Sequence, residues 1–285
     1  MTESALASFS FGRPAGPDLN SPNPARISDY LLNGKDNFEC DRRAVTELLR
    51  AAPELSSLAR AGRDFLMRSA GLLAAEHGID QFIDLGAGLP ASPCTHEVVR
   101  EHGPCRVSYV DHDPVVSVHN RALLTGRPGV WVFEGDLRSP ELLIARLSAT
   151  EAVDFSRPVA VLLGDVLPYL PEPAQTVRAF RNVMTAGSAL VLSHLSRDRA
   201  DPGMVASVEN TYACTGGRLS IRTDAQIAEL FTGFAHAPEI VDVRPDPDVP
   251  GLTGYTGIGW RVRGGQARAA TAAPTTGQRE NASAT

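Results

Sequence analysis

The chain has 285 residues, with 33 acidic against 27 basic residues and a formal net charge of −6. Its 43% hydrophobic and 21% charged residues are typical of a folded globular protein. No run of basic residues could neutralise a nucleic-acid backbone, and no stretch approaches the roughly 20 apolar residues of a membrane-spanning helix. Its four cysteines lack metal-ligand spacing. We therefore expect a cytoplasmic protein without a metal site that binds neither nucleic acid nor membranes.

The two ends of the chain differ from its middle. Residues 1–24 and 265–285 lack hydrophobic periodicity, which predicts flexible tails. Between Arg26 and Leu73 apolar residues recur at helical spacing instead. This pattern predicts a helical lid or cap over residues 25–78, ahead of the first strand.

Beyond Gly78, short apolar runs alternate with turns and helix-like segments, and such alternation predicts a parallel sheet. Right-handed crossovers between the runs give a doubly wound, Rossmann-like core over residues 79–264. The predicted strands are 81–85, 106–110, 130–133, 159–163 and 189–193, followed by a reversed terminal hairpin near 239–243 and 258–262. The predicted helices begin near Pro93, Pro114, Ser139 and Pro171, with a further helix over 224–231.

The first predicted strand ends in the sequence DLGAG, where a doubly wound sheet opens its ligand crevice. Gly86 and Gly88 let a ligand approach the backbone, and with Ala91 they also fit a relaxed dinucleotide fingerprint. Asp84 favours another ligand, because its carboxylate would repel a pyrophosphate and attract the ammonium and sulfonium groups of S-adenosylmethionine. The motif therefore favours S-adenosylmethionine over NAD.

Acidic residues also follow the next two strands. Asp111 is placed to accept both hydroxyls of a ribose. Asp113 competes for that role, but it precedes Pro114 and is also suited to cap the following helix. Asp136 is suited to accept a hydrogen bond from an adenine amino group, with Leu137 packing on the ring. Three carboxylates after three successive strands predict one nucleoside-binding edge.

Five segments of the sequence resemble a family of actinomycete S-adenosylmethionine-dependent methyltransferases that was long known as a domain of unknown function. They are PARISDYLLNGKDNFECDR, FIDLGAGLP, VSYVDHDPVV, EGDLRSPE and FSRPVAVLL, and the resemblance covers about residues 24–262. It implies an α/β class I methyltransferase fold, in which helices that cover the cofactor precede a seven-stranded, mostly parallel sheet. We therefore expect methyl transfer from S-adenosylmethionine to a small-molecule acceptor, in secondary metabolism.

The same resemblance implies a lid at the segment DYLLNGKDNF. Tyr30 and Phe38 are suited to stack or pack over the ligand, while Asn37 could donate hydrogen bonds to it. Lys35, the single lysine of the chain, is suited to meet the carboxylate of the methionine end. Arg63 is a second candidate for that carboxylate. The alternatives are a plain helix–helix contact for the segment and a solvated side chain for Arg63.

Two residues are candidates for a general base. Asp165 follows the fourth predicted strand, at the edge where methyltransferases of this class face their acceptor, and the family pattern tends to be apolar at this position. Its alternative role is to cap the next loop. His194, at the end of the fifth strand, is either a second base or a buried structural histidine. Tyr169 and Tyr212 are expected to shape the acceptor pocket.

Two other functions stay open on the sequence. A noncatalytic regulatory protein that binds S-adenosylmethionine or S-adenosylhomocysteine would keep the same carboxylates, since a fold does not fix a function. An NAD-dependent oxidoreductase is compatible with the glycine spacing, although Asp84 disfavours it. The sequence does not indicate the oligomeric state.

Overall fold

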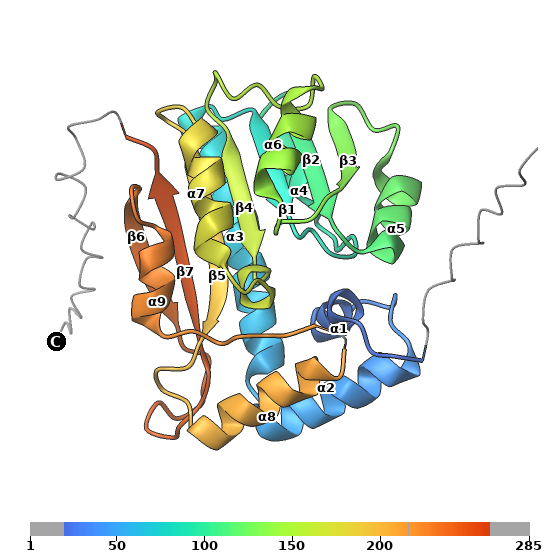
Figure 1. Ribbon diagram of the computed structural model, residues 1–285, viewed down its shortest axis with the longest axis vertical. Helices are drawn as coiled ribbons and strands as arrows, with labels where there is room; N and C mark the ends of the chain where they lie inside the picture. The colour runs from blue at the N-terminus through green and yellow to red at the C-terminus, as the bar shows by residue number, and fades with distance from the viewer. Residues whose placement is uncertain (1–19, 216, 263–285) are drawn as a thin grey trace, which may run out of the picture.

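A seven-stranded sheet runs through the computed structural model in the order β3-β2-β1-β4-β5-β7-β6 (Figure 1). The first five strands are parallel, and β7 lies antiparallel to both β5 and β6. The order reverses between β1 and β4, the switch point at which doubly wound sheets open their ligand crevice. The strands are β1 (Gln81–Leu85), β2 (Arg106–Asp111), β3 (Val130–Glu134), β4 (Ala160–Gly164), β5 (Ala189–Ser196), β6 (Ala235–Val241) and β7 (Thr253–Trp260).

The structure describes residues 20–215 and 217–262, so the predicted tails lie largely outside the described residues. Its helices are α1 (Pro24–Leu31), α2 (Glu39–Ala51), α3 (Leu55–His77), α4 (Thr95–Arg100), α5 (Pro114–Leu124), α6 (Pro140–Ser148), α7 (Pro173–Val183), α8 (Pro202–Ala213) and α9 (Asp224–Leu230), with a 3₁₀ turn η1 (Leu167–Tyr169). In these ranges no helix combines the length and the apolar character needed to cross a bilayer. The predicted α/β fold, with a helical layer before a seven-stranded sheet, is confirmed.

Helices cover both faces of the sheet, which explains why its central strands β4 and β5 begin as continuous apolar runs rather than alternating ones. Successive residues of β1 point to opposite faces: Ile83 joins the cluster under α6, α7 and α9, and Phe82 joins the cluster under α3 and α4. Burying each such side chain stabilises the fold by about 1.5–3 kcal/mol. The two clusters hold the strands in register, and so they fix where the strand ends lie.

A third apolar cluster lies beyond the carboxyl ends of the strands, where α1, α2, α8 and the start of α3 pack together. Figure 1 shows α2 and α8 side by side across this end of the molecule. Ile27, Val45 and Val208 are fully buried there. We call these helices the cap. The cap therefore includes α8, which follows β5 in the chain and was not recognised as a helix, because its small and polar residues give no clear apolar stripe.

The terminal hairpin was predicted correctly as an antiparallel pair, but both strands begin earlier than expected. β6 is an edge strand with four consecutive exposed residues and contains Pro238, so it lacks an apolar run. In β7, a Cβ on Gly257 or Gly259 would lie 2.9 or 2.7 Å from the Phe231 ring, so glycines occupy positions where apolar side chains would mark a strand. The predicted starts near Pro93 and Pro171 were also early, since α4 begins at Thr95 and α7 at Pro173.

Candidate functional site

A glycine turn follows β1 at the switch point. Gly86 and Gly88 have φ of 68° and 64°, which glycine adopts without strain. A Cβ on Gly86 would lie 2.2 Å from Val166 Cγ2, so this glycine also lets the turn pack against the loop after β4. A Cβ on Gly88 would meet no atom within 4 Å. The turn thus leaves open space beside the Gly88 backbone, where a ligand can approach.

Asp111 lies directly against this turn. The backbone N–H of Gly88 donates to Asp111 Oδ2 at 2.9 Å, and that of Asp113 donates to Oδ1 at 3.0 Å. Burial raises the pKa of Asp111, while these two hydrogen bonds lower it. A carboxylate has about four lone-pair sites, so two ribose hydroxyls can still be accepted. The structure therefore brings the predicted ribose anchor and the glycine turn together.

Asp84, in β1 just before the glycine turn, is buried, with 4% of its surface exposed. Thr95 Oγ1 donates to Asp84 Oδ2 at 2.7 Å. Burial raises the pKa of Asp84, and the Arg63 guanidinium opposes that shift. Arg63 itself donates to the carbonyls of Ala91 and Pro93 at 3.0 and 2.8 Å. Arg63 thus holds the segment at Ala91 and Pro93, and Asp84 holds Thr95 at the start of α4. When ionised, the Asp84 carboxylate can attract a cationic ligand.

A cavity of about 320 Å³ lies beside Arg63, between α3, the end of α1 and residues 91–93. Arg60, Arg63 and Arg68 line it, together with Asp64. The excess of positive charge suits an anionic group such as a carboxylate. Lys35, which was predicted for that role, is exposed on the cap and is not among the lining residues.

Asp136 and Leu137 follow β3, as predicted, but both are already engaged. Arg138 donates to Asp136 at 2.9 Å and lowers the pKa of that carboxyl. Leu137 is 6% exposed and belongs to the core cluster under α6 and α7. An adenine amino group would therefore share Asp136 with Arg138, and the ring would reach little of the Leu137 side chain.

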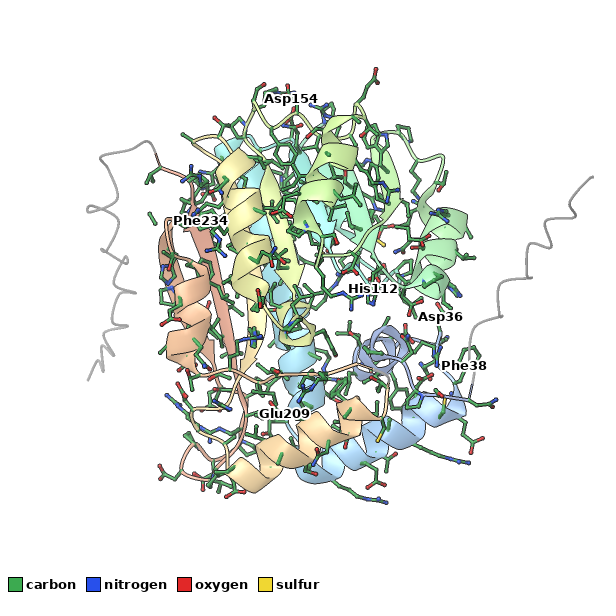
Figure 2. All side chains as sticks on the ribbon, viewed as in Figure 1. Asp36, Phe38, His112, Asp154, Glu209 and Phe234 are labelled. Atoms are coloured by element: carbon green, nitrogen blue, oxygen red, sulfur yellow. The ribbon has the colours of Figure 1, made fainter. Side chains whose placement is uncertain are left out.

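Sequence reasoning missed two residues beside the turn. His112 is largely exposed, and its Nδ1 lies 3.6 Å from Asp111 Oδ1. Figure 2 shows it on the side of the sheet that faces the connection carrying Asp36 and Phe38. Asn120, which is buried on α5, donates to the carbonyl of Gly88 at 3.1 Å. The position of His112 directly after Asp111 was a usable signal, whereas nothing in the sequence marked Asn120.

Within the cap, the fully buried Asp41 carboxylate ties three segments together. It accepts from the backbone N–H of Asn23 at 2.9 Å, from Arg26 Nε at 2.7 Å and from the backbone N–H of Phe38 at 2.8 Å. The Arg26 guanidinium also lies 5.1 Å from the centre of the Phe38 ring. The predicted lid segment is therefore joined to the cap, because α1, α2 and their connection share one buried carboxylate.

The amide of Asn37 shapes this connection. Its Nδ2 donates to Asp29 Oδ2 at 2.8 Å and to the Gly34 carbonyl at 3.1 Å, while Arg42 donates to its Oδ1 at 3.1 Å. These bonds use the groups with which Asn37 was predicted to bind the ligand. Tyr30 and Lys35 are exposed, so a role over the ligand stays a prediction for both.

A side-chain hydrogen bond joins the start of the cap to the loop that follows β2. Asn23 Oδ1 caps α1, and its Nδ2 donates to Asp113 Oδ2 at 2.5 Å. Asp113 in turn caps α5, accepting from the backbone N–H of Val115 at 2.7 Å, which confirms the capping alternative for Asp113. Since Asp113 also donates its backbone N–H to Asp111, the cap is connected through two hydrogen bonds to the predicted ribose anchor.

Asn23→Asp should loosen this connection, because the new carboxylate keeps the α1 cap but repels Asp113. A hydrogen bond to a charged group contributes about 1.5–3 kcal/mol, so we expect about tenfold weaker binding of S-adenosylhomocysteine by calorimetry. The double variant Asn23→Asp/Asp113→Asn exchanges donor and acceptor and should recover most of the affinity. A double variant as weak as the single one would show that the contact does not support binding.

Asp165 lies at the end of β4 with a φ of 49°. Its backbone N–H donates to Ser193 Oγ at 3.1 Å, and a Cβ on Gly62 of α3 would lie 2.9 Å from its Oδ2. Burial raises the pKa of Asp165 to about 6, against a smaller opposite effect of the Ser193 hydrogen bond. In the described ranges no backbone N–H donates to this carboxylate, so the geometry does not support the loop-capping alternative.

His194 is 1% exposed, and both of its ring nitrogens have partners. Nδ1 lies 2.7 Å from the carbonyl of Leu195, and Arg222 donates to Nε2 at 3.1 Å. Burial lowers the pKa of His194 to about 4. A histidine without a free lone pair is a poor base, so the geometry favours the structural alternative for His194.

Tyr169 and Tyr212 complete the surroundings of Asp165. Their rings meet edge to face, with centroids 5.7 Å apart. Burial raises the pKa of Tyr212 to about 12, and the Asp165 charge contributes to the rise for both tyrosines. The structure thus brings Asp165 next to a tyrosine pair contributed by η1 and the cap helix α8.

The family of the chain follows from residues 13–259, which match the family described as S-adenosyl methyltransferase. The chain belongs to this family. It is an S-adenosylmethionine-dependent methyltransferase, and the match decides against the NAD-dependent oxidoreductase. Within the described ranges, no group of three or more His, Cys, Asp or Glu side chains is placed as metal ligands.

Two solved structures resemble the methyltransferase over most of its length. A protein of Thermobifida fusca YX, provisionally named a methyltransferase, is 38% identical, with a TM-score of 0.78 over 89% of this chain and 100% of its own. A DUF574 family protein of Streptomyces avermitilis MA-4680 is 31% identical, with a TM-score of 0.77 over 86% of this chain and 99% of its own. No curated protein sequence matches the methyltransferase.

Proposed function

We propose that this methyltransferase acts on a small-molecule acceptor held between the sheet edge and the cap. The observation that carries the proposal is the cap itself, whose helices pack on a core of their own and are joined to the sheet edge through Asn23 and Asp113. An acceptor must fit beneath such a cover, which favours small molecules over polymers. A setting in secondary metabolism stays a prediction.

The residues at the sheet edge fit S-adenosylmethionine. Asp111 would accept the ribose hydroxyls, and the space beside Gly88 admits the ligand close to the backbone. Asp84 supplies negative charge near the cationic end, and Asp136 would accept the adenine amino group. The arginine-lined cavity supports an alternative to Lys35 for the methionine carboxylate, and it includes Arg63, whose charge acts on Asp84.

Bound S-adenosylmethionine supplies a methyl group already activated by the sulfonium, so placement of the acceptor provides much of the acceleration. The chain contributes Asp165 on the acceptor side. With a pKa near 6, this carboxylate is ionised at neutral pH and basic enough to take a proton from the acceptor. Ser193 and α3 hold it in place.

Methyl transfer can be assigned to an acceptor class with S-adenosylmethionine labelled on its methyl group. The purified methyltransferase is incubated with a pool of small metabolites, with bulk protein or with bulk RNA. We expect label in the small-molecule pool. Label in protein or RNA would overturn the proposal, and so would absence of label from all three pools.

A further inference from the structure

The carboxylate of Asp165 has no cationic partner among the described residues. The two influences on its pKa are burial and the Ser193 hydrogen bond, and it forms no ion pair within residues 20–215 and 217–262. Arg222 lies in the same region, but its guanidinium donates to the carbonyls of Leu167 and Leu170 and to His194. Keeping an ionised carboxylate enclosed without a partner is costly, so a ligand that supplies the cation would be favoured.

The neighbours of Asp165 also suit a cation. The hydroxyls of Tyr169 and Tyr212 are close enough to feel its charge, and aromatic rings attract cations through their negative faces. Asp165 and Tyr169 each keep part of their surface open to solvent, although protein closely surrounds both. Because Tyr212 is only 5% exposed, a ligand can reach the carboxylate from the side of Tyr169.

We propose that the methyl acceptor is an amine, whose ammonium form binds at Asp165 beside Tyr169 and Tyr212. This inference rests on the proposed function and names the acceptor class. A hydroxyl acceptor would leave the carboxylate unpaired, whereas an ammonium group forms a charge-assisted hydrogen bond with it. Asp165 then has two roles, since it selects the cation and afterwards takes a proton from it.

The transfer balances with these groups alone. The bound ammonium gives one proton to the Asp165 carboxylate, which frees the nitrogen lone pair. That lone pair forms the new N–CH₃ bond as the S–CH₃ bond of S-adenosylmethionine breaks, and the bond pair stays on sulfur to give S-adenosylhomocysteine. The product leaves as a methylated ammonium, and Asp165 returns its proton to water. No oxidant, reductant or metal is needed.

The test compares two probes of the same size on the full chain saturated with S-adenosylhomocysteine: benzylamine, which is cationic at pH 8, and benzyl alcohol, which is neutral. We expect calorimetry to give a dissociation constant about tenfold or more lower for benzylamine, the scale of one charge-assisted hydrogen bond. Asp165→Asn should abolish the difference, because the amide keeps the size and tolerates the positive φ but lacks the charge.

Asp154→Asn is the matched control, because this exposed aspartate (Figure 2) precedes the amino end of β4, whereas Asp165 follows the carboxyl end of that strand. It should leave the preference unchanged. Equal affinities in the wild type, failure of both probes to bind, or a preference that survives Asp165→Asn would each overturn the amine assignment. Saturation with S-adenosylhomocysteine is measured first. If S-adenosylhomocysteine does not bind, the cofactor site is contradicted rather than the amine assignment. The cofactor site and the amine assignment are therefore tested separately.

Discussion

Asp111→Ala is expected to weaken binding of S-adenosylhomocysteine about 100-fold or more, because two hydrogen bonds between a carboxylate and ribose hydroxyls contribute about 1.5–3 kcal/mol each. The same substitution removes the acceptor for the Gly88 N–H, so the glycine turn also loses a support. Isothermal titration calorimetry on the purified variant measures the change directly.

Asp136→Ala is the comparison that makes this result specific. Asp136 also follows a strand at the sheet edge, but it is half-exposed and paired with Arg138, so its loss should weaken binding about tenfold at most. Circular dichroism at the working temperature checks that both variants are folded. A folded Asp111→Ala variant with wild-type affinity, or a larger loss in Asp136→Ala, would remove Asp111 from the role of ribose anchor.

The core of the fold could be predicted from the sequence because β1, β2, β4 and β5 are almost wholly buried. Leu162 and Val191 belong to uninterrupted apolar runs, which are typical of parallel strands covered on both faces. The terminal hairpin gave a weaker signal, since β7 carries glycines where Phe231 needs space. Helix α8 gave almost none, because its partners in the cap are more than a hundred residues earlier in the chain.

The site was predictable where chemistry follows from a strand end, and unpredictable where it depends on distant partners. Asp111 could be placed at the sheet edge from its position after β2. The residue type of His194 and its position at the end of β5 suggested a general base as well as Asp165 did. In the structure, Arg222 and the Leu195 carbonyl occupy its two ring nitrogens. Asn23 looked like an ordinary residue of the tail, and only the folded cap shows that it reaches Asp113.

Asp165→Asn is expected to make the protein more stable at pH 8 while reducing methyl transfer about 100-fold, the usual scale for loss of a general base. The stability change follows from the raised pKa of about 6 in the folded protein, compared with about 3.9 in the unfolded chain. Between those values the unfolded chain releases a proton that the folded protein keeps, so wild-type stability falls as pH rises. The loss levels off as pH rises past about 7, where the folded carboxyl is also mostly ionised.

The variant lacks this titration, so its advantage should grow from near zero at pH 4 to about 2 kcal/mol at pH 8, allowing for the partial exposure of Asp165. Urea unfolding of both proteins across this pH range gives the difference, in which all other titrating groups cancel. If the free energies of unfolding of the two proteins changed with pH in parallel, the pKa of Asp165 would not be raised in the folded protein, and the prediction would be wrong. Ionised Asp165 lowers the free energy of unfolding and is nevertheless needed for turnover. An acceptor that binds the ionised carboxylate accounts for both effects, since replacing the carboxylate with an amide removes the loss of stability and the activity together.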